Sequence, residues 1–264
     1  MSLLEDIVSR KRDEVSSARK LCSLTDLERA LPSAPPVRPL RSGKEVSARP
    51  GVIAEMKRRS PSRGLIRDPY DPVSIAASYH RSGARALSIL TDTPFFGGEL
   101  GDLTRVRQSP AGEALPLLRK DFVVDPYQVI ESRVAGADIL LLIVRILPGE
   151  LLSELLHLGT SLGLTVLVET HTGDEVGRAL SAGAQVVGVN SRDLDTLTID
   201  WDRGAHLLAG IPPGILRVAE SGLKNRADYL RMGEFGADFV LVGESFLLAS
   251  DPGWALGEFC GTVD

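Results

Sequence analysis

A carboxylate and an ammonium occupy alternate positions where a short apolar run ends. Glu55 and Lys57 follow the segment Val-Ile-Ala at 52–54. If this run is a β-strand, alternation of side chains places both groups on one face. Two such groups are costly there unless they pair or take part in chemistry, which favours a functional pair over an ordinary surface pair. The loop after them, at 58–64 and including Ser60, carries hydroxyls, basic groups and glycine, and we expect it to bind an anion.

A lysine and a glutamate end two further apolar runs. Lys120 shares a strand face with Phe122, and Glu169 follows three apolar residues. A lysine that acts as a general acid needs a lowered pKa, which we expect from burial and from a neighbouring cation such as Lys57. A glutamate that faces this lysine would place an acid and a base in one cavity. The alternative for Lys120 is a surface lysine that happens to follow a strand.

Polar groups also end the last three runs of this kind. Asn190 and Arg192 follow one run, and Glu220 and Ser221 follow the next. Ser221-Gly222 and Gly243-Glu244-Ser245 then place small residues after the two final runs. Glycine lets a backbone approach an anion closely, so we expect a phosphate site there, with the backbone N–H of Glu244 as a donor. Two ordinary helix-start turns are the alternative.

The elements that must position these residues are eight apolar runs separated by helical patterns. Continuous apolar runs that alternate with helices are typical of buried parallel strands, and eight such units predict a (β/α)8 TIM barrel, whose site lies at the carboxyl ends of the strands. A Gly-Ala pair precedes every second run, which indicates a four-fold βαβα repeat. The runs cover residues 52–57, 87–92, 116–121, 139–144, 165–169, 186–190, 217–221 and 239–245.

We therefore expect an α/β chain of one domain over 1–264, with a barrel at 51–264 and an N-terminal helical extension at 1–50. Residues 3–20 and 23–31 have the pattern of two amphipathic helices, and Pro32–Gly43 has that of an extended connector. The sequence leaves two roles open for the extension. It is either a passive addition or a cover over one mouth of the barrel.

Composition excludes several classes of function. The net charge of −5 argues against a general nucleic-acid binder, and no apolar run approaches the roughly 18 residues of a membrane span. Two cysteines without CxxC spacing indicate neither a disulfide scaffold nor a zinc site, and the four histidines show no ligand spacing. We assign His171 to a loop. The expectation is a cytoplasmic monomer that acts on a small anionic molecule, without nucleic-acid or membrane partners.

Several long blocks, in order, resemble the indole-3-glycerol phosphate synthase family over nearly the whole chain. They are IAEMKRRSPSRG from Ile53, LLRKDFVVDPYQ from Leu117, LVETHTGDEVGRALSAGAQVVGVNSRDLDT from Leu167, and VAESGL with FVLVGESF from Val218 and Phe239. The resemblance implies closure of an indole ring from 1-(2-carboxyphenylamino)-1-deoxyribulose 5-phosphate, with loss of carbon dioxide and water. It implies no cofactor and no metal.

The resemblance also implies roles for individual residues. Lys120 matches the general acid and Glu169 the general base. Lys57 matches a catalytic lysine that binds the anionic groups of the substrate, and the resemblance leaves open whether it shares the acid role. Further matches are Glu55 and Asn190 as orienting groups, Ser60, Arg192 and Glu220 as substrate contacts, Phe96 and Phe122 as aromatic contacts, and Ser221, Gly222, Gly243 and Glu244 as phosphate loops. The run at 139–144 ends without a charge, and we expect Leu142, or else Ile143, to form an apolar wall there.

Three other functions compete with this one. Phosphoribosylanthranilate isomerase is also a phosphate-binding barrel enzyme, but the acid–base set and the N-terminal extension argue against it. A Schiff-base aldolase would use a lysine as a nucleophile instead of an acid. A non-catalytic barrel that binds phosphate ligands is disfavoured because every acid–base position is filled.

Overall fold

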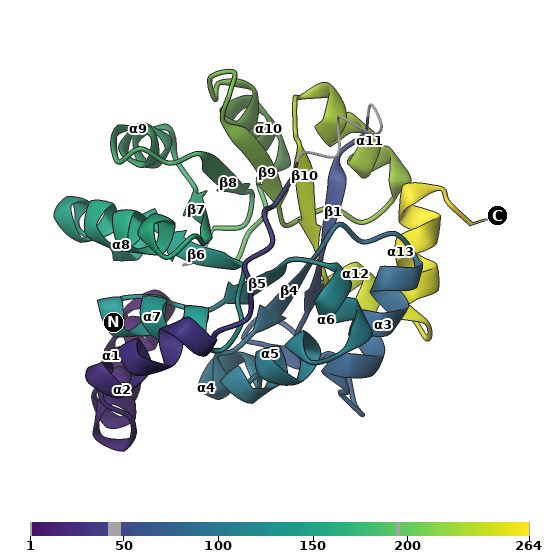
Figure 1. Cartoon of the computed structure of the whole chain (residues 1–264). Helices are drawn as coiled ribbons and strands as arrows, with labels where there is room; N and C mark the ends of the chain where they lie inside the picture. The colour runs from purple at the N-terminus through teal and green to yellow at the C-terminus, as the bar shows by residue number, and fades with distance from the viewer. Residues whose placement is uncertain (1, 42–48, 194–195, 264) are drawn as a thin grey trace.

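The computed structural model describes residues 2–41, 49–193 and 196–263 and shows a closed parallel barrel (Figure 1). Strand β1 pairs in parallel with both β4 and β10, which closes the ring. All eight predicted runs form these strands, so the predicted fold class is confirmed. The strands are β1 (Gly51–Met56), β4 (Ala86–Leu90), β5 (Leu117–Lys120), β6 (Ile139–Ile143), β7 (Thr165–Thr170), β8 (Val186–Asn190), β9 (Leu216–Glu220) and β10 (Phe239–Val242).

Helices surround the barrel, and their first turns follow the sequence signals. Asp71 and Asp125 accept hydrogen bonds from the backbone N–H groups of Val73 and Tyr127, so both are N-caps ahead of a proline. The helices are α3 (Pro72–Arg81), α4 (Thr93–Phe96), α5 (Leu100–Arg107), α6 (Pro110–Ala114), α7 (Pro126–Val134), α8 (Gly149–Ser161), α9 (Gly173–Ser181), α10 (Trp201–Ala209), α11 (Arg226–Glu234), α12 (Glu244–Leu247) and α13 (Pro252–Cys260). Short 3-10 turns are η1 (Leu31–Ser33) and η3 (Val144–Ile146), and a small hairpin joins β2 (Arg59–Ser60) to β3 (Gly64–Leu65).

The Gly-Ala repeat marks four equivalent turns from a helix into a strand. Gly83, Gly136, Gly183 and Gly236 have φ angles of 93°, 95°, 91° and 91°. The alanine after each glycine donates its backbone N–H to a carbonyl in the last turn of the preceding helix, at 2.9–3.1 Å. Each helix therefore ends in a glycine turn that residues with a side chain rarely adopt, which explains the repeat.

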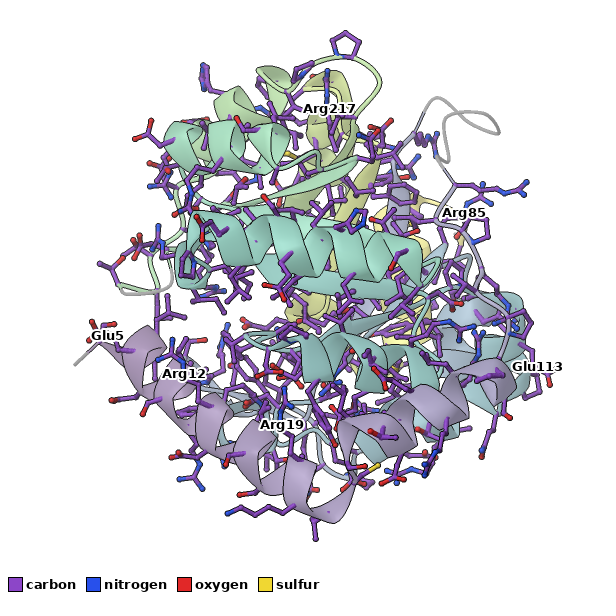
Figure 2. The ribbon with its side chains drawn as sticks, turned by 60° about the vertical axis from the view of Figure 1, so that its left-hand side comes forward. Glu5, Arg12, Arg19, Arg85, Glu113 and Arg217 are labelled. Atoms are coloured by element: carbon purple, nitrogen blue, oxygen red, sulfur yellow. The ribbon has the colours of Figure 1, made fainter. Side chains whose placement is uncertain are left out.

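The N-terminal extension packs on the outside of the barrel beside α7 (Figure 1). Helices α1 (Leu3–Leu21) and α2 (Leu24–Ala30) form as predicted, and Val15 and Leu27 bury against Tyr127 and Ile130. The exposed side of α1 carries charged residues such as Glu5, Arg12 and Arg19 (Figure 2). The predicted connector begins with η1 and runs without regular structure to residue 41, and its last two residues lie outside the described residues.

Two apolar layers hold the barrel together. One fills its interior with side chains such as Ile53, Leu118 and Leu167, and the other lies between the strands and the helices. No helix in the described residues has the length and hydropathy needed to cross a membrane.

Candidate active site

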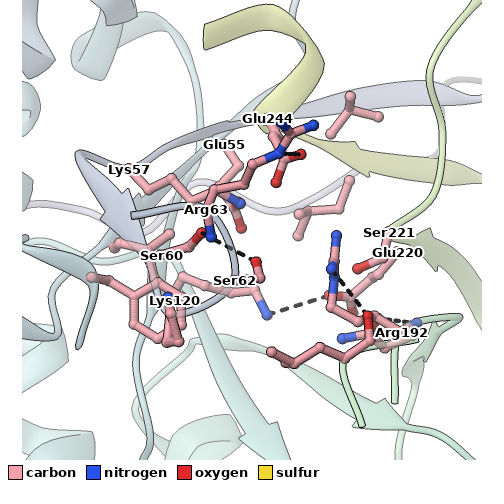
Figure 3. Close-up of a pocket in the computed structure, with 18 of the residues that line it drawn as sticks. Glu55, Lys57, Ser60, Ser62, Arg63, Lys120, Arg192, Glu220, Ser221 and Glu244 are labelled. Carbon is pink, nitrogen blue, oxygen red and sulfur yellow. Dashed lines mark hydrogen bonds and ion pairs between the residues drawn. The ribbon is translucent and has the colours of Figure 1, made fainter. Parts of the chain in front are cut away.

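A cavity of about 330 Å³ lies at the carboxyl ends of the strands, where parallel barrels carry their sites (Figure 3). All but one of the predicted site residues line it. These are Glu55, Lys57, Ser60, Phe96, Lys120, Phe122, Glu169, Asn190, Arg192, Glu220, Ser221, Gly222, Gly243 and Glu244. They come from the ends of seven strands and the segments that follow them, which a closed parallel barrel brings to one face.

Glu55 and Lys57 pair on one face of β1, as the alternation predicts. The Lys57 ammonium donates to Glu55 Oε1 at 2.5 Å. Burial alone would raise the pKa of Glu55, but the charges of Lys57 and Lys120 outweigh burial and lower it. Glu55 is therefore an anion whose position is fixed between two cations.

The pKa of Lys120 is shifted in the direction opposite to the one expected from the sequence. Its ammonium lies 2.7 Å from Glu169 Oε2 and 3.4 Å from Glu220 Oε2. Burial alone would lower the pKa of Lys120, but Glu169, Glu220 and Glu55 outweigh burial and raise it. The prediction that Lys57 lowers the pKa of Lys120 was wrong. Three glutamates lie around this ammonium, and their effect stabilises its charged form.

Glu169 is held by an amide as well as by the lysine. Asn190 donates from Nδ2 to Glu169 Oε1 at 2.9 Å, and its own Oδ1 accepts from the backbone N–H of Arg192 at 3.0 Å. Asn190 thus orients the carboxylate in this structure. Burial works to raise the pKa of Glu169, but Lys120 and His171 lower it to about 2. In this state Glu169 is a weak base.

The pKa of Glu220 is raised, whereas that of Glu169 is lowered. Burial raises its pKa, Lys120 lowers it, and the neighbouring Glu169 and Glu55 raise it again, to about 8. Gly188 makes room for this side chain, because a Cβ atom at position 188 would lie 2.2 Å from Glu220 Oε1. Gly188 and Glu220 lie on the adjacent strands β8 and β9 but far apart in the chain. No sequence pattern therefore indicated that position 188 must be glycine.

The predicted phosphate loops form one end of the cavity. Ser221 has a φ angle of 66° and Gly222 one of 81°, so the chain turns sharply just after β9. Gly243 and Glu244 lie at the start of α12. The Glu244 carboxylate accepts from Arg63 Nε at 2.9 Å, so its partner is a cation from the loop after β1 (Figure 3). The negative charge of Glu244 is therefore paired with Arg63 at this end of the cavity.

The apolar wall is real, but Leu142 is not part of it. In the parallel register of β6 with β7, Ile143 aligns with Glu169 and Leu142 with Val168. Ile143 and Leu141 therefore face the cavity, and Leu142 is fully buried under the helices. The wall also contains Phe96 and Phe122, whose ring centroids lie 6.1 Å apart.

The N-terminal extension supplies residues that the sequence analysis missed. Leu3, Leu4 and Ile7 of α1 line the cavity, so this helix covers part of the barrel mouth. The signal was present in the sequence: buried positions of α1 recur at Leu4, Ile7, Lys11 and Val15. A lysine inside such an apolar stripe indicates a buried ion pair.

Lys11 connects the extension to two strand ends. Its ammonium lies 3.0 Å from Asp92 Oδ1 and 3.0 Å from Asp121 Oδ1. Asp92 caps α4, which carries Phe96, and Asp121 accepts from the backbone N–H of Phe122 at 2.8 Å. The same cation therefore fixes both segments that hold the aromatic pair.

These features define a (β/α)8-barrel enzyme that gathers lysines and carboxylates at the strand ends. A family model described as indole-3-glycerol phosphate synthase matches residues 4–259. The chain belongs to the indole-3-glycerol phosphate synthase family.

Curated relatives agree with this assignment, and a solved structure agrees with the fold. An indole-3-glycerol phosphate synthase of Mycobacterium sp. (strain KMS) is 45% identical over 258 residues, which are 97% of this chain and 93% of the relative. One from Saccharopolyspora erythraea is 43% identical over 252 residues, covering 96% and 92%. A 3-hexulose-6-phosphate synthase structure has a TM-score of 0.64 at 14% identity, covering 82% of this chain and 100% of that one, which shows the barrel fold alone.

Proposed function

We propose that this chain is a carboxy-lyase that converts 1-(2-carboxyphenylamino)-1-deoxyribulose 5-phosphate to indole-3-glycerol phosphate in tryptophan biosynthesis. The observation that carries the proposal is the contact between Lys120 and Glu169, at 2.7 Å, in a cavity with an aromatic wall at one end and the phosphate loops at the other. We place the activity in the cytoplasm. We also propose a monomer, which is supported by a cavity whose assigned residues all come from one chain.

The substrate fits the distribution of groups in the cavity. Its aromatic ring lies against Phe96, Phe122 and Ile143, and its phosphate lies at Ser221 and Gly243. Lys57 and Ser60 contact anionic and hydroxyl groups between these ends, and Arg192 and Glu220 line the opposite side. This arrangement holds the ketone carbon close to Lys120.

Lys120 is the general acid of ring closure. Because its pKa is raised, the lysine is protonated and polarises the ketone oxygen by its charge. Attack by the ring carbon that bears the carboxylate makes that oxygen an alkoxide, which is basic enough to take the lysine proton. Loss of carbon dioxide then restores the aromatic ring.

Glu169 is the general base of the dehydration that follows. Its pKa is low while Lys120 is charged. Once Lys120 has given up its proton, this Coulombic effect disappears and Glu169 becomes a stronger base. The contact therefore orders the two steps. The acid acts first, and the carboxylate then removes a proton from the newly closed ring and passes it to the hydroxyl, which departs as water.

The direct test is turnover of purified protein with this substrate, without added metal or cofactor. We expect a product with indole fluorescence and release of one carbon dioxide per product. The same assay with phosphoribosylanthranilate tests the isomerase alternative, and borohydride treatment in the presence of substrate tests for a Schiff base at a lysine. No indole product would overturn the proposal.

A further inference from the structure

The structure places His171 directly behind the proposed general base. It follows β7 two residues after Glu169, and it has no exposed surface. Its Nε2 atom lies 3.4 Å from Glu169 Oε1, on the side of the carboxylate away from Lys120. The sequence analysis had assigned this residue to a loop without a role in the site.

The other side of the imidazole is anchored. Its Nδ1 lies 3.3 Å from Glu175 Oε2, and this oxygen also accepts from the backbone N–H of His171 at 2.6 Å. Arg145, from η3, holds the second oxygen of Glu175 at 3.1 Å. Groups on α9 and η3 therefore set the position of the imidazole ring.

The imidazole nitrogen that faces Glu169 is a buried polar atom without an aligned hydrogen bond in the described part of the chain. A carboxylate only accepts hydrogen bonds, so Glu175 assigns a proton to Nδ1. With this proton on Nδ1, the Nε2 atom of the neutral ring carries a lone pair that accepts a hydrogen bond. Asn190 reaches the same Glu169 oxygen through an NH₂ group, which only donates.

We propose that His171 is a positioning residue that holds Glu169 after this carboxylate has taken a proton. The hydroxyl of the protonated carboxyl then donates to Nε2 of the neutral imidazole, so the carboxyl group keeps its orientation toward Lys120 and the cavity. This inference rests on the proposed function, because it needs Glu169 to change protonation during turnover.

Three substitutions separate this role from simple packing. His171→Leu removes both polar contacts, His171→Asn keeps a polar group at the position of Nδ1 only, and His171→Gln places an amide at the position of Nε2. The carbonyl oxygen of a glutamine amide accepts a hydrogen bond, as the Nε2 lone pair of the neutral imidazole does. Melting temperatures of all three variants report on the fold separately.

We expect His171→Leu to lower kcat by about 10–100-fold, since small misplacements of a reacting group have effects of this size, and to leave KM within about twofold. His171→Gln should recover kcat to within about threefold, whereas His171→Asn should stay near the leucine value. Equal recovery by asparagine, or a loss confined to KM, would overturn the proposal.

A double-mutant comparison gives a second, independent readout. In a Glu169→Gln background, His171→Leu should change the residual rate by less than about twofold, because its effect acts through Glu169. If the two losses multiply instead, His171 acts elsewhere and the proposal fails. Absence of indole product from the unchanged protein would overturn the proposed function, and this inference with it.

Discussion

Lys11 on the first helix and Asp121 at the end of β5 form a buried ion pair of 3.0 Å, one residue away from Lys120. Arg119 and Thr91 bind the other oxygen of Asp121, and Lys11 also contacts Asp92. The N-terminal extension is therefore connected by charge to the strand end that carries the proposed acid, in addition to its apolar contacts with the cavity.

Lys11→Met should destabilise the protein and reduce its activity. It removes the cation that the buried carboxylates of Asp92 and Asp121 share and leaves Arg119 as the cation at Asp121, which costs about 3–5 kcal/mol. The freed aspartates should also shift the aromatic pair, so we expect the kcat/KM of the folded fraction to fall by about 10-fold. Lys20→Met, on the exposed end of the same helix, is the control and should stay within about 0.5 kcal/mol. Equal stability of the two variants in urea unfolding would refute the argument.

Lys120→Met should lower kcat by about 10²–10⁴-fold with a smaller change in KM, because general acid catalysis contributes rate enhancements of this order. Lys57→Met should act mainly on KM, since Lys57 pairs with Glu55 and is proposed to bind the anionic groups of the substrate. Steady-state kinetics of both variants measures the division. An equal fall of kcat in the two would mean that they share the acid role.

Ser221 allows the hydroxyl group and the backbone to be tested separately. A hydrogen bond to a charged group contributes about 1.5–3 kcal/mol, so Ser221→Ala should raise KM by roughly 10–100-fold at nearly unchanged kcat. Ser221→Gly should raise KM by a similar factor but be the more stable of the two, because glycine adopts the φ of 66° without strain. Calorimetric binding of inorganic phosphate should weaken in both variants. Unchanged phosphate affinity would place the phosphate elsewhere.

Glu220 should make the protein less stable as the pH rises. Its pKa is about 8 in the folded chain and near 4.3 when unfolded, so the folded state binds more protons between these values and stability falls with pH across this window. Glu220→Gln removes the effect. At pH 8.5 it should raise the melting temperature by about 2–4 °C for each kcal/mol recovered, with little change at pH 4. A stabilisation that is the same at both pH values would contradict the raised pKa.

Leu141 and Leu142 are adjacent but should behave differently. Leu142→Ala leaves a hole under the helices and should cost about 2–5 kcal/mol, while the folded protein keeps its KM. Leu141→Ala opens the apolar wall of the cavity and should raise KM for the aromatic substrate. Chemical unfolding and steady-state kinetics on both variants decide this. A higher KM in the Leu142 variant alone would reverse our assignment of the two faces.

The sequence by itself determined the barrel and most of the contents of its site. Strand runs, N-caps such as Asp71 and glycine turns such as Gly83 are local signals, because they depend on residues a few positions apart. The charged residues at the strand ends could be assigned to one site because parallel strands of a barrel all end on the same face.

The tertiary structure decided what depends on distant neighbours. The pKa of Lys120 rises because Glu169 and Glu220 lie beside it, and no spacing in the chain fixes those distances. Leu142 faces the helices because the register with β7 sets which side of β6 points inward. His171 also depends on a tertiary contact. Its position against Glu169 is set by Glu175 and by the packing of α9 against η3, which the sequence alone does not specify.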